Sequence, residues 1–207
     1  GCLDGYQKLQ TLYHNEQHML EVVLCTARLL HGVHLSGRSF SADGIDMAIM
    51  GALLHDIGYL KRDGEEAGTG AQFTVTHVQR GTVFARRHLT TEPASFLASL
   101  ANVILITDHR LPVERLTFGS AEEELAAKIT GTADLVGQMA NREYLERLLL
   151  LFFEFQEAGM GNFADFDALL EGTAAFYRKT CQRLDGPLGA LSPFLARHFE
   201  KADGVRG

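Results

Sequence analysis

A few of the nine histidines in this 207-residue chain stand at spacings that suit metal binding. His14 and His18 are four residues apart at the start of a predicted helix, so both side chains leave one face with Cβ atoms about 5–6 Å apart. His55 and Asp56 close the apolar segment 49–54. A carboxylate and an imidazole at the end of an apolar helix are costly unless something compensates them. A divalent cation is the simplest compensation, because its ligands are deprotonated Asp and neutral His.

Asp134 repeats this pattern in a third predicted helix, where Leu135 and Val136 should face the core. Each residue also has a simpler interpretation, because a single His or Asp near an apolar face is more often a core residue or a cap. His14 alone suits a helix N-terminus, and Asp134 alone suits an ion pair with Arg142. The adjacent histidine and aspartate are more specific, and the combination favours a metal site.

Three segments together resemble the ordered H…HD…D pattern of the HD-domain superfamily of metal-dependent phosphohydrolases. They are Tyr13-His14-Asn15-x-x-His18, the segment 54–58 (Leu-His-Asp-Ile-Gly) and the segment 132–135 (Thr-Ala-Asp-Leu). The resemblance covers residues 12–140 and implies that one metal ion is bound by four residues: His18, His55, Asp56 and Asp134. The Tyr-His-Asn opening also resembles that of cyclic-nucleotide phosphodiesterases, which implies that His14 protonates the leaving oxygen.

Two further histidines extend the resemblance to HD proteins that hold two metal ions. His77 and His109 stand between Asp56 and Asp134 in the chain. The resemblance implies that Asp56 bridges two ions and that these histidines complete the second site. The alternative is that His77 lies on a solvated face and His109 caps a helix. His and carboxylate ligands suit Fe, Mn, Co, Ni or Zn, whereas more oxygen-rich surroundings favour Mg.

A phosphorylated substrate needs cationic partners besides the metal. Lys61 follows the His-Asp segment and Arg142 follows Asp134, so both are candidate substrate-binding residues, although each is equally a surface charge. HD families with an HD-Ile-Gly-Lys segment carry a lysine after the glycine, and Tyr59 occupies that position here. A lysine contact from that position is therefore not expected.

The leading functional hypothesis is hydrolysis of a small phosphomonoester or phosphodiester, with a nucleotide as one candidate, by metal-activated water. His14 and Asp56 are the expected catalytic residues. A di-iron oxygenase is the second hypothesis, because some HD-fold enzymes use four His and two Asp ligands to hold two irons. A non-catalytic nucleotide-binding regulator is the third.

The elements that must position these residues are predicted to be helices almost throughout. Apolar residues recur every three or four positions, and the breaks at 36–41, 63–70 and 112–120 are rich in glycine and polar residues. The short apolar run 102–106 could be taken for a strand, but no partner strand is evident. We expect an all-α HD-type helical bundle as one domain, 2–207, with the metal site in 12–140 and additional C-terminal helices in 141–203. Beyond the segments around the candidate ligands, the predicted helices are 72–88, 93–107, 121–138, 143–156, 163–184 and 187–199.

Composition limits the partners. A net charge of −7 argues against binding to nucleic acid, which needs a basic surface. No run of eighteen apolar residues predicts a membrane span. The three cysteines form no close pair, so we expect no disulfide framework and a cytoplasmic setting. A homodimer is left open.

Overall fold

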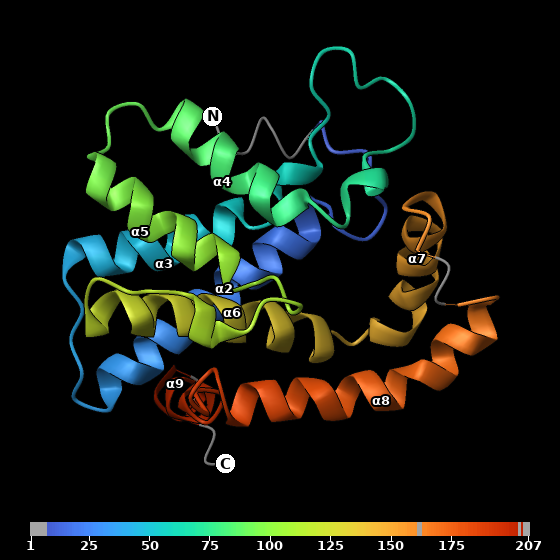
Figure 1. Ribbon diagram of the computed structural model, residues 1–207. Helices are drawn as coiled ribbons and strands as arrows, with labels where there is room; N and C mark the ends of the chain where they lie inside the picture. Colours follow the sequence, from blue (N-terminus) through green and yellow to red (C-terminus); the bar gives the residue numbers. More distant parts are fainter. Residues whose placement is uncertain (1–7, 161–162, 203, 205–207) are drawn as a thin grey trace.

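The computed structural model describes residues 8–160, 163–202 and 204, and all regular structure in these ranges is helical (Figure 1). This confirms the predicted all-α bundle. The predicted domain boundary at residue 2 lies outside the described residues. The α-helices are α2 (Glu16–Leu35), α3 (Ala42–Leu54), α4 (His77–His88), α5 (Ala94–Leu105), α6 (Ala121–Met139), α7 (Tyr144–Glu157), α8 (Phe166–Asp185) and α9 (Phe194–Ala202). Three short 3-10 helices connect them: η1 (Ile57–Tyr59), η2 (Ala71–Phe73) and η3 (Val113–Arg115).

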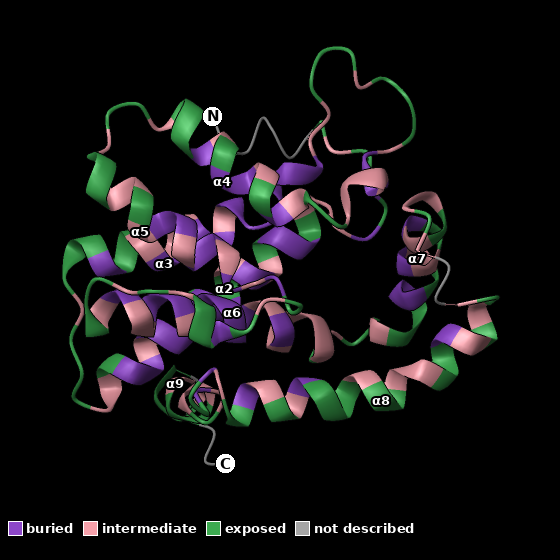
Figure 2. Cartoon of the chain, in the orientation of Figure 1, coloured by how far each residue is buried: buried purple, intermediate pink, exposed green. Residues whose placement is uncertain are grey.

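The bundle is organised around α6, which packs against α2, α3 and α5. The buried residues concentrate where these helices meet (Figure 2). Val22, Cys25, Leu29 and Val33 of α2 are buried in this core, and their spacing of three and four residues places them on one apolar face of the helix. Burial of each larger apolar side chain contributes about 1.5–3 kcal/mol. The candidate ligands therefore sit on helices that are held by the main core.

Local sequence determines where α2 begins. The Asn15 side chain accepts a hydrogen bond from the backbone N–H of His18 at 3.2 Å, which is the usual arrangement of an N-cap asparagine. The cap places His18 in the first turn of the helix and leaves His14 in the segment before it. The spacing of the two histidines predicted that they share one face of a helix, and this is wrong because only His18 is helical. Their ring centroids nevertheless lie 5.8 Å apart.

Two other helix boundaries differ from the prediction. The predicted helix 72–88 is split into η2 and α4, because the backbone N–H groups of Thr74 and Thr76 bond to the carbonyl oxygens of Ala71 and Phe73 in tight turns before α4 begins at His77. The predicted helix 187–199 begins only at Phe194, because Gly189 and Ala190 adopt positive φ angles. The run 102–106 is helical and ends α5.

The C-terminal helices α7 and α8 lie at the side of the bundle formed by the other helices (Figure 1). Most of α8 is exposed or half-buried, and its buried residues are Leu169, Thr180 and Leu184. Among the described residues, no helix combines the length and the apolar character that crossing a membrane would require.

Gly58 is the point of closest approach between η1 and α4. A Cβ atom there would lie 1.8 Å from the His77 carbonyl oxygen and 2.8 Å from the Gly81 nitrogen. Because both neighbours are backbone atoms, Gly58→Ala should push η1 away from α4 and lower the free energy of unfolding by about 3 kcal/mol or more. Urea denaturation measures this change.

Gly137→Ala in α6 is the matched control. Its Cβ would meet nothing closer than 3.8 Å, so the substitution should leave stability unchanged or raise it by up to about 1 kcal/mol, the helix propensity difference. Equal midpoints for Gly58→Ala and the unsubstituted protein would show that the η1–α4 contact is not tight.

Candidate metal centre

Four side chains from three helices converge at one point in the bundle. His18 comes from the first turn of α2, His55 and Asp56 from the end of α3, and Asp134 from the middle of α6. The His18 Nε2 lies 3.4 Å from Asp56 Oδ2 and 3.4 Å from Asp134 Oδ1. The His55 Nε2 lies 3.0 Å, 3.6 Å and 3.4 Å from Asp56 Oδ2, Asp134 Oδ1 and His18 Nε2, respectively. We call these four residues the His-Asp cluster.

These separations suit atoms that share one metal ion. Ligands held about 2.0–2.2 Å from an ion in tetrahedral or octahedral arrangement lie about 3.0–3.6 Å from one another. His18, His55 and Asp56 form a buried group whose ligand atoms all lie within 4.8 Å of each other. The group of His18, His55 and Asp56 could therefore bind a divalent ion, and Asp134 Oδ1 lies 3.4 Å and 3.6 Å from the Nε2 atoms of its two histidines.

The hydrogen bond made by the second ring nitrogen of His55 supports this geometry. The Nδ1 of His55 lies 2.8 Å from the Ala52 carbonyl oxygen, which fixes Nδ1 as the donor and leaves the Nε2 lone pair toward Asp56 when the ring is neutral. The buried Asp56 Oδ2 has no hydrogen-bond partner among the described residues. When the His55 ring is neutral, its Nε2 lone pair and Asp56 Oδ2 face each other 3.0 Å apart in a buried site, which is unfavourable unless a metal ion or a proton lies between them.

In the absence of an ion, protons take that place. Burial lowers the pKa of His55, but the adjacent Asp56 carboxylate more than offsets this and raises it to about 9. Burial likewise acts against ionisation of Asp56, yet the surrounding histidines hold the pKa of this carboxyl well below its usual range. The site thus favours a deprotonated carboxylate beside positive charge, which a divalent ion supplies while it displaces the imidazole protons.

His77 joins the site from the other side of Asp56. Its Nε2 lies 3.3 Å from Asp56 Oδ1, and its Nδ1 is bonded to the Thr74 carbonyl oxygen at 2.7 Å. The two oxygens of Asp56 therefore face different histidines, as a bridging carboxylate would. His109 follows α5, is exposed, and makes no hydrogen bond or ion pair with the cluster among the described residues.

His14 lies beside the cluster and is held by a residue that the sequence interpretation missed. Its Nδ1 lies 2.5 Å from Oε2 of Glu154 in α7, and Glu154 also accepts hydrogen bonds from the backbone N–H groups of Tyr13 and His14. Burial lowers the pKa of His14, but Glu154 and Asp56 reverse the effect, so its pKa is raised. An acidic residue within the apolar stretch 148–155 was the only signal of Glu154 in the sequence.

Tyr59 packs against both His14 and His77, whose own ring centroids lie 6.1 Å apart. Its buried ring stacks on both imidazoles, with ring centroids 4.7 Å and 4.4 Å apart. Tyr59 therefore supports two histidines by packing.

The two predicted substrate cations point elsewhere. The Lys61 ammonium donates to the carbonyl oxygens of Glu66 and Gly68 in its own loop. Arg142 is exposed and lines a different cavity, between α2 and the end of α6. Neither makes a contact with the His-Asp cluster among the described residues.

The cluster is open on one side. The side chains of His18, His55 and Asp56 are 2–3% exposed, whereas those of His14, His77 and Asp134 are 16–18% exposed. A substrate would therefore approach from the side of the latter three. α7 frames this side, because Glu154 holds His14 and Glu157 accepts hydrogen bonds from Thr69 and Gly70.

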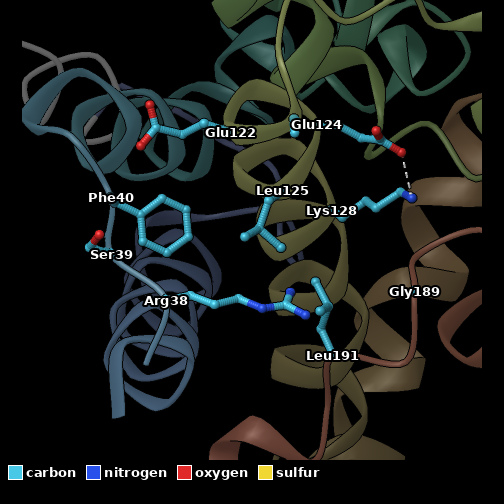
Figure 3. A pocket seen from close by; sticks show the side chains of 10 residues that line it. Arg38, Ser39, Phe40, Glu122, Glu124, Leu125, Lys128, Gly189 and Leu191 are labelled. Atoms are coloured by element: carbon cyan, nitrogen blue, oxygen red, sulfur yellow. Dashed lines mark ion pairs between the residues drawn. The ribbon is translucent and has the colours of Figure 1, made fainter. Parts of the chain in front are cut away.

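A cavity of about 600 Å³ lies away from this centre, between the loop at 38–40, the start of α6 and the segment 189–191 (Figure 3). Its charged groups are largely engaged with each other. Lys128 pairs with Glu124 at 2.7 Å, and Glu122 accepts hydrogen bonds from the Ser41 backbone N–H and hydroxyl. This cavity brings no set of ligating side chains together, so the His-Asp cluster is the stronger candidate site.

Comparison with known proteins identifies one family. The model of the Npun_R2479-like family matches residues 62–185, more than half of the chain. The chain belongs to the Npun_R2479-like family. No curated protein and no solved structure matches it.

The region that matches the Npun_R2479-like family contains only some of the candidate site residues. The candidate residues inside the matched range are His77, His109, Asp134, Arg142 and Glu154. The candidate residues before it are His14, His18, His55, Asp56 and Lys61.

Proposed function

We propose that this protein is a metal-dependent phosphohydrolase of the HD type that acts on a small phosphomonoester or phosphodiester. The observation that carries the proposal is that Asp56 Oδ2 lies 3.4 Å and 3.0 Å from the Nε2 atoms of His18 and His55 in a buried group, while Asp134 Oδ1 lies 3.4 Å and 3.6 Å from the same two atoms. This Asp56 oxygen has no hydrogen-bond partner among the described residues. The order of these residues in the chain and the HD-Ile-Gly segment support the same assignment.

A divalent ion in the cluster would supply Lewis acidity, lowering the pKa of a water molecule and neutralising charge on a phosphoryl oxygen. The role of the protein is to hold the ligands in a fixed orientation. Hydrogen bonds to the Ala52 and Thr74 carbonyl oxygens orient the His55 and His77 rings, so that little rearrangement is needed during the reaction.

His14 is placed to donate a proton to the leaving oxygen. Its Nδ1 is bonded to Glu154, so Nε2 is the atom available to a substrate at the open side of the cluster. The raised pKa favours the protonated imidazole that a general acid needs. Glu154 acts here as the positioning residue for this general acid.

Glu154→Gln should reduce kcat on the order of tenfold and move the alkaline limb of the pH–rate profile to lower pH. The acid is active when protonated, below its pKa. Glu154 raises that pKa, so its removal makes the acid lose its proton at lower pH. The profile of kcat against pH with a phosphodiester substrate measures the shift.

Glu157→Gln is the control for this prediction. Glu157 lies one turn along α7 and bonds to Thr69 and Gly70 rather than to His14, so the limb should stay in place. An unchanged limb in Glu154→Gln would rule out His14 as the titrating acid.

The functional assay is turnover of a panel of nucleotides and generic phosphoesters with Mn or Co. We expect hydrolysis of at least one ester and its loss in the metal-stripped protein, with recovery on addition of the ion. A complete absence of turnover at every metal loading, with tight nucleotide binding, would instead support the regulator.

A di-iron oxygenase remains the second candidate, because the two oxygens of Asp56 face His77 on one side and His18 and His55 on the other. Its full set of ligands also requires His109, which is exposed and makes no hydrogen bond or ion pair with the cluster among the described residues. Burial lowers the pKa of His109, and the nearby Asp134 carboxylate acts in the opposite direction. Five of the six expected ligands are thus assembled, which favours the hydrolase. Iron content and oxygen uptake with polyol or phosphonate substrates distinguish the two.

A further inference from the structure

Another polar cavity lies beside η1 and α4. It has a volume of about 240 Å³ and is lined by the η1 segment, the loop that follows it and the part of α4 from Arg80 to His88. We call it the α4 basic cavity. Its ionisable lining residues are Lys61, Arg62, Asp63, Arg80, Arg87 and His88.

The charge of this lining contrasts with that of the whole chain. Four cationic side chains meet there with one lining carboxylate, Asp63, in a protein whose net charge is −7. Glu65 adds a second negative charge nearby, where it pairs with Arg80. The cavity therefore keeps an excess of positive charge after its internal ion pairs are counted.

The cations fall into two classes. Arg80 is fully engaged, because its guanidinium donates to the carbonyl oxygens of Gly58 and Leu60 and to both oxygens of Glu65. The Lys61 ammonium is bonded to loop carbonyl oxygens. These two side chains hold the walls of the cavity in place.

Arg62 and Arg87 form the other class. Neither guanidinium group makes a hydrogen bond or ion pair among the described residues, and both side chains are exposed at the cavity. The charge of Arg62 does help to lower the pKa of the nearby Glu65, whose carboxylate already pairs with Arg80. The basic last turn of α4 (Arg86, Arg87 and His88) also complements the helix dipole. That role does not account for Arg62, which reaches the same cavity from a different segment.

We propose that the α4 basic cavity is a binding site for a small phosphorylated anion, held by Arg62 and Arg87. Guanidinium groups bind phosphoryl oxygens in a bidentate manner, and two of them from separate segments form a clamp. The volume suits a phosphoryl group rather than a whole large ligand.

This site is distinct from the proposed catalytic centre. Arg87 follows His77 by ten positions in α4, a distance of about 15 Å along the helix axis. An anion in the cavity is therefore not at the position of hydrolysis. It would instead contact the wall formed by Ile57 and Gly58, which follow Asp56 directly in the chain. The site is thus placed to couple an anionic effector to the metal ligands, and its existence does not depend on the proposed function.

The test is calorimetric titration with inorganic phosphate of protein that has been stripped of metal and desalted, so that phosphate has no ion to bind at the His-Asp cluster. We expect saturable binding at one site per chain. Arg87→Gln and Arg62→Gln should each weaken it at least tenfold. Arg86→Gln is the matched control, because Arg86 lies in the same turn, is exposed and does not line the cavity.

The absence of saturable binding would overturn the proposal, as would equal weakening by Arg86→Gln, since this would indicate diffuse attraction by surface charge. Circular dichroism of each variant confirms that the helices are intact. A parallel titration with a nucleoside monophosphate distinguishes the source of the anion. Tighter binding than that of phosphate assigns the site to a phosphoryl group of a larger molecule, and equal or weaker binding assigns it to free phosphate.

Discussion

Asp56→Ala is expected to abolish tight metal binding and to lower kcat/KM for phosphoester hydrolysis about a thousandfold or more. Asp56 is the residue on which the other ligands converge, since its Oδ2 faces His18 and His55 while its Oδ1 faces His77. Loss of the ion removes several kcal/mol of transition-state stabilisation, and each 1.36 kcal/mol corresponds to about a factor of ten in rate.

The measurement combines steady-state kinetics with metal content on the same preparation. Asp46→Ala is the matched control, because Asp46 is an exposed aspartate of the same helix, α3, and lies outside the cluster. It should retain both activity and metal. Full activity in Asp56→Ala would contradict the proposed function.

The second large effect is expected for His14→Gln. This variant should lower kcat by about 10²–10⁴ for an alkyl or nucleoside ester, the range for loss of a general acid. The metal should remain bound, because the His14 side chain is hydrogen-bonded to Glu154 and not to the cluster.

A comparison of leaving groups makes this prediction specific. A p-nitrophenyl ester leaves as a stable anion and needs little protonation, so its hydrolysis should be much less affected than that of an alkyl ester. His34→Gln, at the exposed end of α2, is the control and should change neither rate. Equal losses for the two esters would show that His14 does not act as the acid.

The helices were predictable from the sequence because apolar spacing and local caps specify them. Asn15, Ser41 and Pro93 begin three helices through interactions or angles set within a few residues. The turn before His77 was not predicted, because Gly70 and the residues after η2 adopt their conformation through local hydrogen bonds that leave the apolar spacing unchanged.

The candidate site shows the same division between local and distant information. His55 and Asp56 stood out because two polar residues close an apolar segment, a pattern within a few positions. Glu154 did not, because its partner His14 is 140 residues away in the chain and only the packing of α7 brings them together. Arg142 is close to Asp134 in sequence, but it lies beyond the end of α6 and lines a different cavity.

Helix α7 both packs against the protein and positions segments of the candidate site, and only the packing was predicted from the sequence. Its apolar residues suggested a packing element, and Leu148 and Leu151 are indeed buried. Its polar side chains hold the segments on either side of the site. Arg147 bonds to the Tyr13 carbonyl oxygen, Glu154 bonds to His14, and Glu157 holds the loop before η2. No periodicity of apolar residues encodes such contacts.

The most direct test of the central claim is the number of divalent ions per chain in protein purified without chelator, measured by elemental analysis beside Asp56→Ala. We predict at least one tightly held first-row ion per chain in the unsubstituted protein and the loss of this ion in Asp56→Ala. A second ion per chain would indicate that Asp56 bridges two ions and that His77 is a ligand of the second one. A protein that binds no ion above background, or a variant that retains the same amount, would contradict the assignment of the His-Asp cluster as a metal centre.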